Sequence, residues 1–206
     1  MSRILTTEET LLNYAAWYAM RYFPSLQKLR ESLMRKSANN TVLTEKVMQQ
    51  MSEYISEERI VDGLVRMYVE QSKTRPYIEQ KLHLKKFGNE IIVTTLESYR
   101  DSFVSWNTYE QTITRKIHDY LAKNKSRKYI SGTLVQKYPN FKREIATFLD
   151  TVVPDETEAV REEFQKLAQK YSLTDRKEQQ KIIQKLSMKG FSYDAIKKVM
   201  KERFTE

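Results

Sequence analysis

One spacing of apolar residues occurs four times along this chain of 206 residues. Each occurrence has two apolar residues four positions apart, then a short turn, then a second such pair. Side chains four positions apart lie on one face of an α-helix, so each occurrence predicts two helices joined by a turn. We call these residues the anchors. They are Leu29, Leu33, Leu43 and Val47; Ile78, Leu82, Ile92 and Leu96; Ile130, Leu134, Ile145 and Leu149; and Ile182, Leu186, Ile196 and Met200.

A further helical stretch precedes each set of anchors, at residues 11–22, 59–71, 113–123 and 157–170. The repeating unit is therefore three helices, and its first anchor recurs at intervals of 49, 52 and 52 residues. One unit of this size cannot bury its apolar face alone, so neighbouring units must stack. The predicted fold is all-α: an elongated, curved array of four tandem three-helix repeats at residues 1–51, 52–107, 108–152 and 153–206.

Glycine and proline mark the expected breaks between helices. Gly88 and Gly190 fall between anchor pairs, where a left-handed residue ends a helix, and Pro139 cannot continue one. Linkers are expected at residues 51–56, 99–108 and 152–156, the last of which contains Pro154. The β-branched run at residues 90–96 is also typical of a strand, but its place inside a repeat predicts a helix.

The residue types that carry enzyme chemistry are scarce. The chain has no cysteine, which excludes disulfides and thiolate sites, and its four glycines never cluster into a phosphate-binding loop. His83 and His118 belong to different repeats and to no ligand motif. No apolar stretch reaches the roughly 18 residues that a membrane span needs. We therefore expect a cytoplasmic, non-enzymatic protein with no membrane contact, catalytic residue, metal or cofactor.

The formal net charge of +9 is concentrated in the third repeat. Between residues 115 and 128 there are six basic residues and a single acid, Asp119, with Tyr120 in the run and Tyr129 directly after it. A basic run can be an ordinary solvated face, or it can attract a polyanion or an acidic protein. Aromatic rings beside cations favour the binding role. The candidate residues, with a smaller group in the second repeat, are Arg75, Lys81, Lys85, Lys86, Arg115, Lys116, Lys123, Lys125, Arg127 and Lys128.

Aromatic residues also recur along the first expected helix. Tyr14, Tyr18 and Tyr22 stand four residues apart, and Trp17 lies beside them. This stripe predicts either core packing between the first and second repeats or an exposed partner-binding face.

Several stretches of the chain resemble the RecX family. Residues 55–61 (ISEERIV), 75–82 (RPYIEQKL) and 85–87 (KKF) look like its central segment. Residues 24–33 (PSLQKLRESL) resemble its opening stretch, and residues 185–196 (KLSMKGFSYDAI) resemble its closing helices. The resemblance covers most of the chain and rests on packing and turn residues. It implies tandem three-helix units and a regulator that binds in the groove of the RecA recombinase filament on DNA.

The chain departs from the RecX pattern in two respects. The family commonly has three units, whereas four are expected here, and the basic third repeat looks like the addition. Ile60 and Val61 stand where the family tends to have Phe and Ala, and residues 37–40 lack its Lys-Gly turn.

Three functions agree with these observations. The first is a monomeric RecX-like regulator whose partners are the RecA filament and single- or double-stranded DNA, and which mostly inhibits recombination, ATPase and SOS-related activities. The second is a stand-alone helix-turn-helix-like DNA-binding regulator, which requires base-reading Arg, Asn or Gln along an exposed helix, a signature that no helix shows clearly. The third is a purely protein-binding scaffold. Recovery of a recombinase from bacterial lysate, with and without nuclease, distinguishes the first from the others.

Overall fold

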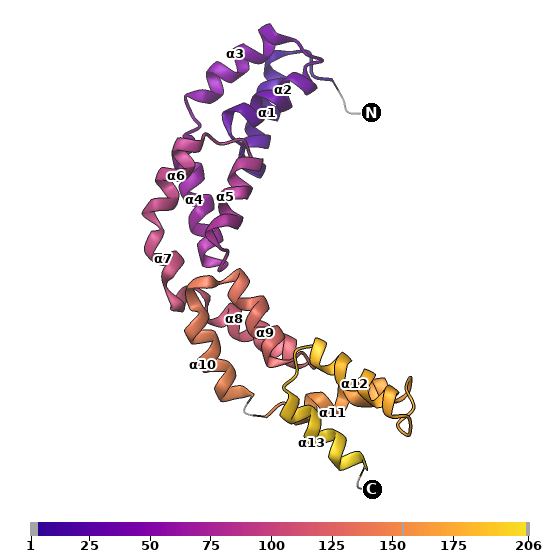
Figure 1. The fold of residues 1–206 in the computed structure, drawn as a ribbon. Coiled ribbons are helices and arrows are strands. Elements are labelled where there is room, and N and C mark those ends of the chain that lie inside the picture. The colour runs from indigo at the N-terminus through magenta and orange to yellow at the C-terminus, as the bar shows by residue number, and fades with distance from the viewer. Residues whose placement is uncertain (1–3, 154, 205–206) are drawn as a thin grey trace. The chain divides into compact units, whose positions relative to one another are not determined.

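The computed structural model describes residues 4–153 and 155–204, and every regular element in these ranges is helical (Figure 1). The all-α prediction is confirmed, and the β-branched run at residues 90–96 lies within a helix. Pro154, predicted to mark a linker, is outside the described residues. The elements are α1 (Glu8–Tyr22), α2 (Leu26–Lys36), α3 (Thr41–Ser52), α4 (Glu57–Glu70), α5 (Arg75–Leu84), α6 (Asn89–Ser98), α7 (Arg100–Val104), α8 (Trp106–Leu121), α9 (Arg127–Lys137), the 3-10 helix η1 (Pro139–Phe141), α10 (Lys142–Val152), α11 (Thr157–Ala168), α12 (Arg176–Met188) and α13 (Tyr193–Phe204).

The chain forms two compact units, Met1–Val104 and Ser105–Glu206. Unit 1 contains α1 to α7, and unit 2 contains α8 to α13. The boundaries of the four repeats, and their arrangement as an elongated, curved array, stay predictions.

Polar residues explain where several helices begin. The side chains of Thr7, Ser25, Ser56 and Ser126 each accept a hydrogen bond from the backbone N–H three residues later, and that of Asn40 does the same. Each bond satisfies one of the N–H groups that a helix start leaves without a partner. Such a cap contributes about 0.5–2 kcal/mol to stability.

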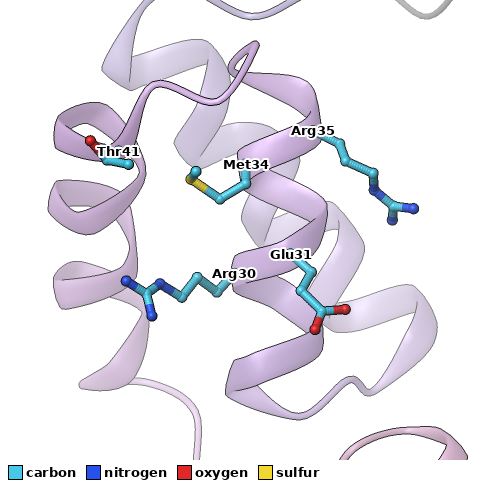
Figure 2. A pocket seen from close by; sticks show the side chains of 5 residues that line it. All are labelled: Arg30, Glu31, Met34, Arg35 and Thr41. Atoms are coloured by element: carbon cyan, nitrogen blue, oxygen red, sulfur yellow. The ribbon is translucent and has the colours of Figure 1, made fainter.

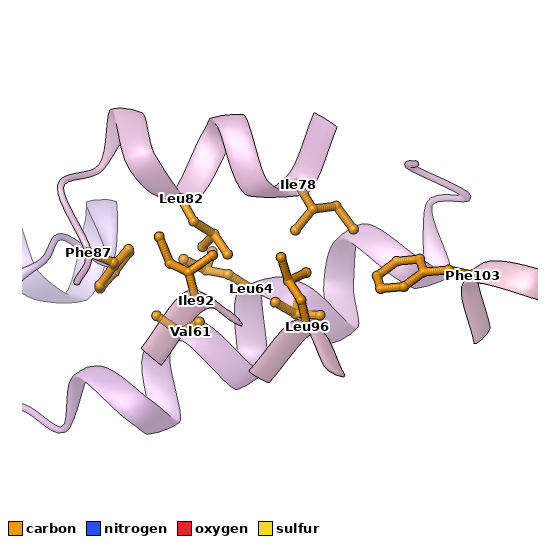
Figure 3. Packing of buried hydrophobic residues seen from close by; sticks show 9 residues of the cluster. Val61, Leu64, Ile78, Leu82, Phe87, Ile92, Leu96 and Phe103 are labelled. Carbon is orange, nitrogen blue, oxygen red and sulfur yellow. The ribbon is translucent and has the colours of Figure 1, made fainter. Parts of the chain in front are cut away.

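Four clusters of buried apolar side chains lie in the described part of the chain, two in each unit. They come from α1–α3, α4–α7, α8–α10 with η1, and α11–α13. Every anchor except Leu43 is buried, which confirms the predicted helical register. In the second cluster, Ile78 and Leu82 of α5 point toward Ile92 and Leu96 of α6 (Figure 3). Full burial of one such side chain stabilises the fold by about 1.5–3 kcal/mol.

In α3 the buried position predicted for Leu43 is taken by the next residue, Thr44, while Val47 is buried as predicted. Thr44 is buried there, whereas Leu43 is only partly buried against the same cluster. The hydroxyl groups of Thr44 and Ser37 are 3.0 Å apart and hydrogen-bonded to each other. A buried polar group is tolerated when it has such a partner, so this pair explains the shift.

Two local predictions from the sequence are wrong. The segment at residues 99–108, predicted as a linker, contains α7 and the start of α8, because Phe103 is buried against the cluster of α4–α6. The left-handed residue after α5 is Lys86, with φ +65°, whereas Gly88 has φ −62° and precedes the first residue of α6. Gly190 does have the predicted positive φ, at +88°.

A serine and a glutamate connect successive helix groups in unit 1. The hydroxyl of Ser25, a fully buried residue at the start of α2, donates to the carbonyl oxygen of Lys85 at 2.7 Å. The N–H of Leu26 donates to a carboxylate oxygen of Glu57 at 2.6 Å. These two bonds tie the start of α2 to the end of α5 and to the start of α4.

The same arrangement occurs in unit 2. The hydroxyl of Ser126 donates to the carbonyl oxygen of Lys189 at 2.6 Å, and the N–H of Arg127 donates to Glu156 at 2.6 Å. We call each set of two bonds a serine–glutamate joint. Each joint fixes the position of the basic residues that lie next to it.

Candidate partner-binding surfaces

The basic run of unit 2 surrounds the turn between α8 and α9. Arg115 and Lys116 lie on α8, Lys123 and Lys125 lie in the turn, and Arg127 and Lys128 form the first turn of α9. Four of the six are exposed, namely Arg115, Lys123, Lys125 and Lys128, while Lys116 and Arg127 are partly buried. The exposed lysines beside the turn therefore carry the accessible positive charge of this surface.

Arg127 differs from the lysines because it is held by neighbouring acids. Its guanidinium forms an ion pair with Asp150 of α10, and its backbone N–H belongs to the serine–glutamate joint. This arginine therefore contributes to packing within unit 2 as well as to its charge.

Tyr129 supplies an aromatic surface at the end of this basic run. Its ring is 45% exposed, and the ammonium of Lys125 lies 5.2 Å from the ring centroid. Tyr120 packs edge to face against it, with ring centroids 5.8 Å apart. A tyrosine with an adjacent ammonium can contact either a nucleic-acid base or an aromatic or carboxylate group of a protein.

A pocket of about 240 Å³ lies beside this turn, between it and α11–α12. Glu163 in its wall is only 8% exposed and forms ion pairs with Lys166 and Lys189. Burial, the largest effect, opposes ionisation of this carboxyl, but the hydrogen bonds from the two lysines outweigh it and hold the pKa of Glu163 below its ordinary value. The pocket is lined by Lys123, Asn124, Lys125, Ser126, Tyr129, Glu163, Met188 and Lys189.

Acid should weaken unit 2 through Glu163. Because its pKa is lower in the folded state than the ordinary value of 4.5, the ionised carboxylate stabilises the fold above that value. The contribution is lost as the pH falls through the folded-state pKa. Glu163→Gln should therefore lower the free energy of unfolding at neutral pH by about 1–3 kcal/mol. The difference between the two proteins should shrink toward pH 3 in urea unfolding, and an unchanged difference would contradict this role.

The smaller basic group of unit 1 divides into two parts. Arg75 and Lys81 lie on α5, where Arg75 pairs with Glu97 at 3.2 Å and the ammonium of Lys81 lies 5.3 Å from the Tyr77 ring centroid. The ammonium of Lys73, which is not among the residues predicted from the sequence, lies 5.7 Å from the same ring centroid. Tyr77 is 38% exposed, so α5 presents a tyrosine between lysines much as α9 does.

Lys85 and Lys86 instead connect helix groups. The ammonium of Lys85 donates to the carbonyl oxygen of Tyr22 at 2.5 Å, and burial lowers the pKa of Lys85. Lys86 forms an ion pair with Glu31 of α2. Both contacts join the end of α5 to the α1–α2 region, so these two lysines have a structural role that the sequence pattern did not predict.

A groove of about 500 Å³ lies between α2 and α3 in unit 1. In Figure 2 the side chains of Met34 and Arg30 extend from α2 toward α3, and those of Glu31 and Arg35 extend from the other side of α2. The groove is lined by Arg30, Glu31, Met34, Arg35 and Thr41. Arg30 is engaged by Glu45 of α3, at 2.5 Å. This ion pair spans the groove, so the groove is a feature of α2–α3 packing and not a continuation of the basic surface on α5.

Comparison with known proteins finds similarity to RecX proteins. Residues 154–200 match the description "RecX, third three-helix domain". The chain is also 22% identical over 198 residues to "Regulatory protein RecX" from Streptococcus mutans serotype c, and this alignment covers 92% of the chain and 76% of the relative. The resemblance to the RecX family is confirmed. No solved structure matches the chain significantly.

The RecX match falls on the last helix group of the chain. It spans α11–α13 and the cluster that contains Ile182, Leu186 and Ile196. The family description counts this domain as the third, whereas three buried clusters precede the matching one here. The serine–glutamate joint of unit 2 connects the RecX-matching group to the basic turn between α8 and α9.

Neither histidine lies in a cluster of possible ligands. His83 and His118 are exposed, and His118 packs edge to face on Phe148 at 6.0 Å. Within residues 4–153 and 155–204, no three or more His, Asp or Glu side chains gather where they could hold a metal ion. No helix of that part of the chain is both long and apolar enough to cross a membrane.

Proposed function

We propose that this RecX-type chain is a non-enzymatic regulator that binds the RecA recombinase filament on DNA and mostly inhibits its activities. The similarity to a RecX regulatory protein over 92% of the chain carries the proposal. RecX proteins are regulators built from three-helix units, and the helix groups of this chain agree with that architecture.

The charge of the chain supports a polyanionic or acidic partner. Residues 100–150 carry ten basic and five acidic side chains, so more than half of the formal net charge of +9 lies there. A filament of protein on DNA offers both phosphates and acidic side chains. The exposed lysines at the α8–α9 turn, with Tyr129 beside Lys125, are suited to either kind of contact.

Substitution of three exposed lysines tests this proposal and leaves the serine–glutamate joint of unit 2 in place. Replacing Lys123, Lys125 and Lys128 together by Gln should reduce inhibition of RecA ATPase and strand exchange, because the accessible charge of the turn is removed. Arg127 is left in place, since its ion pair with Asp150 stabilises the fold. ATPase assays of RecA on single-stranded DNA, titrated with each protein, measure the effect.

The matched control replaces Lys177, Lys181 and Lys197 by Gln. These lysines are also exposed in unit 2, and they lie on α12 and α13, so the loss of charge is equal. If both triple variants inhibit RecA equally well, the turn is an ordinary solvated face. If the unsubstituted protein neither inhibits RecA nor recovers a recombinase from lysate, the RecX-type function itself fails.

Binding to naked DNA separates the two kinds of contact at the turn. If the three lysines contact phosphates, the slope of log affinity against log salt should fall by about 0.9 per lost contact for duplex DNA and about 0.7 for single strands. If they contact an acidic face of RecA, naked DNA binding should stay intact while inhibition falls. Fluorescence anisotropy of labelled DNA over a salt series distinguishes these outcomes.

A further inference from the structure

The last two turns of α1 carry a row of aromatic rings in mutual contact. Tyr14 lies 5.7 Å from Trp17 and 5.8 Å from Tyr18, and Tyr22 lies 5.7 Å from Trp17 and 4.9 Å from Tyr18, all measured between ring centroids. The row is only partly core. Tyr14 and Tyr18 pack against the cluster of α1–α3, whereas Trp17 is 48% exposed and Tyr22 is 44% exposed. The buried part therefore packs within the first helix group, and not between the first and second repeats as predicted. Binding of a partner by the exposed part stays a prediction.

Two further apolar side chains extend the exposed part of the row. Met20 is 78% exposed and Phe23 is 50% exposed. Phe23 ends α1 in the left-handed region, with φ +45°, a conformation that bulky residues rarely adopt. Large apolar side chains gathered on a surface mark an interaction site more often than single ones do.

Cations accompany the rings, and acids are missing from this stretch of sequence. The guanidinium carbon of Arg21 lies 5.8 Å from the ring centroids of both Trp17 and Tyr22. The ammonium of Lys36 lies 5.2 Å from the Tyr14 ring. Between Thr10 and Arg30 the chain has basic residues but no acidic one. The partner of this surface should therefore combine flat rings with negative charge.

We propose that the exposed aromatic row of α1, with Arg21, binds single-stranded nucleic acid by stacking bases on Trp17 and Tyr22. Trp17 and Tyr22 are five residues apart, a rise of about 7.5 Å along the helix. Their ring planes are nearly perpendicular, at 84°, so each ring offers its own exposed surface to a separate base. Stacking of this kind is independent of base sequence, and the cations neutralise the phosphates that follow the bases. A duplex keeps its bases stacked inside, so it cannot use the rings in this way. This inference does not rest on regulation of RecA.

Trp17 itself can report the binding. The chain has two tryptophans, and replacing Trp106 by Phe leaves Trp17 as the only one. Trp106 packs edge to face on Phe141 in unit 2, at 5.6 Å, so phenylalanine keeps a ring there. Titrating this full-length variant with an oligothymidylate should quench Trp17 fluorescence saturably. A duplex of equal length should quench it far less.

Substitutions in the row provide a second readout by anisotropy. Trp17→Ala and Tyr22→Ala should each weaken oligothymidylate binding about tenfold, the loss expected for one stacked base. Trp17→Phe should retain most of the affinity because it retains a ring, which separates stacking from misfolding. Arg21→Gln should reduce the salt slope by about 0.7. Tyr54→Ala is the matched control, since Tyr54 is 82% exposed in the same unit but lies outside the row.

Several outcomes would overturn the inference. Absence of quenching at saturating oligothymidylate would do so, as would equal affinity of Trp17→Ala and Tyr54→Ala. So would quenching by duplex equal to that by single strands. A shift of Trp17 emission with anionic lipid vesicles, or with a purified protein partner but not with oligothymidylate, would assign the row to another partner. None of these results depends on inhibition of RecA, so the two proposals can fail separately.

Discussion

Replacing Leu82 by alanine should lower the free energy of unfolding of unit 1 by about 2–5 kcal/mol. The side chain of Leu82 is fully buried in the cluster of α4–α7, where it lies next to Ile78 and Ile92 (Figure 3). Truncation removes apolar contacts and leaves a cavity, because helices on both sides are held by other members of the cluster. Urea unfolding followed by circular dichroism measures the loss.

Leu84→Ala is the matched control for this experiment. Leu84 lies on the same helix but is 63% exposed, so its truncation should change stability by no more than about 0.5 kcal/mol. The chain consists of two compact units, so the transition should be assigned to unit 1 by comparison with a substitution in unit 2, such as Leu186→Ala. Equal effects of Leu82→Ala and Leu84→Ala would show that α5 is packed in a different register.

The fold class and most of the core follow from the sequence because they depend on local periodicity. A pair of apolar residues four positions apart defines a helix face whatever the chain does elsewhere. The exception at Leu43 shows the limit of that argument. There a polar contact between Thr44 and Ser37 satisfies two hydroxyl groups in the core, and apolar spacing alone contains no information about it.

The α7 helix, too, could not be predicted from the spacing of apolar residues alone. Residues 99–108 have no anchor spacing, and a linker was the natural prediction. The helix forms there because Phe103 packs on a core made by α4–α6. Tertiary contact therefore determines the structure of this segment. A helix this short has too few residues to show a helical spacing of apolar residues in the sequence.

The composition of the basic surface was predictable, but the contacts of its individual members were not. Lys86 pairs with Glu31 and Arg127 with Asp150, partners that are far away in the sequence. A run of basic residues shows that positive charge is present. It does not show which cations are engaged by acids of other helices, and that distinction determines which lysines are accessible to a partner.

The serine–glutamate joints had a signal in the sequence that periodicity alone does not use. Ser25 and Ser126 each precede the first anchor of their repeat by four residues, and Glu57 and Glu156 each stand at the start of the helix that opens the following repeat. If the repeats are aligned on these polar residues as well as on the anchors, the serine and glutamate of the first joint fall opposite those of the second. The repeated contacts explain how a three-helix group that buries little surface alone is held to its neighbour.

Gly190→Ala should lower the free energy of unfolding of unit 2 by about 2–4 kcal/mol. About 1–2 kcal/mol of this comes from placing alanine in the left-handed region, and about 1–2 kcal/mol comes from losing the hydrogen bond between Ser126 and Lys189. Gly190 has φ +88°, and an added Cβ would lie 2.7 Å from the hydroxyl oxygen of Ser126. That hydroxyl donates to the carbonyl oxygen of Lys189, so the new methyl group must displace the joint. Urea unfolding of the two proteins measures the difference.

Two comparisons separate the backbone effect from the steric one. Gly132→Ala, in the interior of α9 with no atom near the added Cβ, should instead stabilise by about 0.5–1 kcal/mol, because alanine loses less backbone entropy in a helix. In a Ser126→Ala background the hydroxyl is absent. Gly190→Ala should then lower the free energy of unfolding only by the ~1–2 kcal/mol of a left-handed alanine. If Gly190→Ala costs the same with and without the Ser126 hydroxyl, the two residues are not coupled. The joint of unit 2 would then not depend on glycine at this turn, in agreement with unit 1, where Lys86 occupies the corresponding left-handed position.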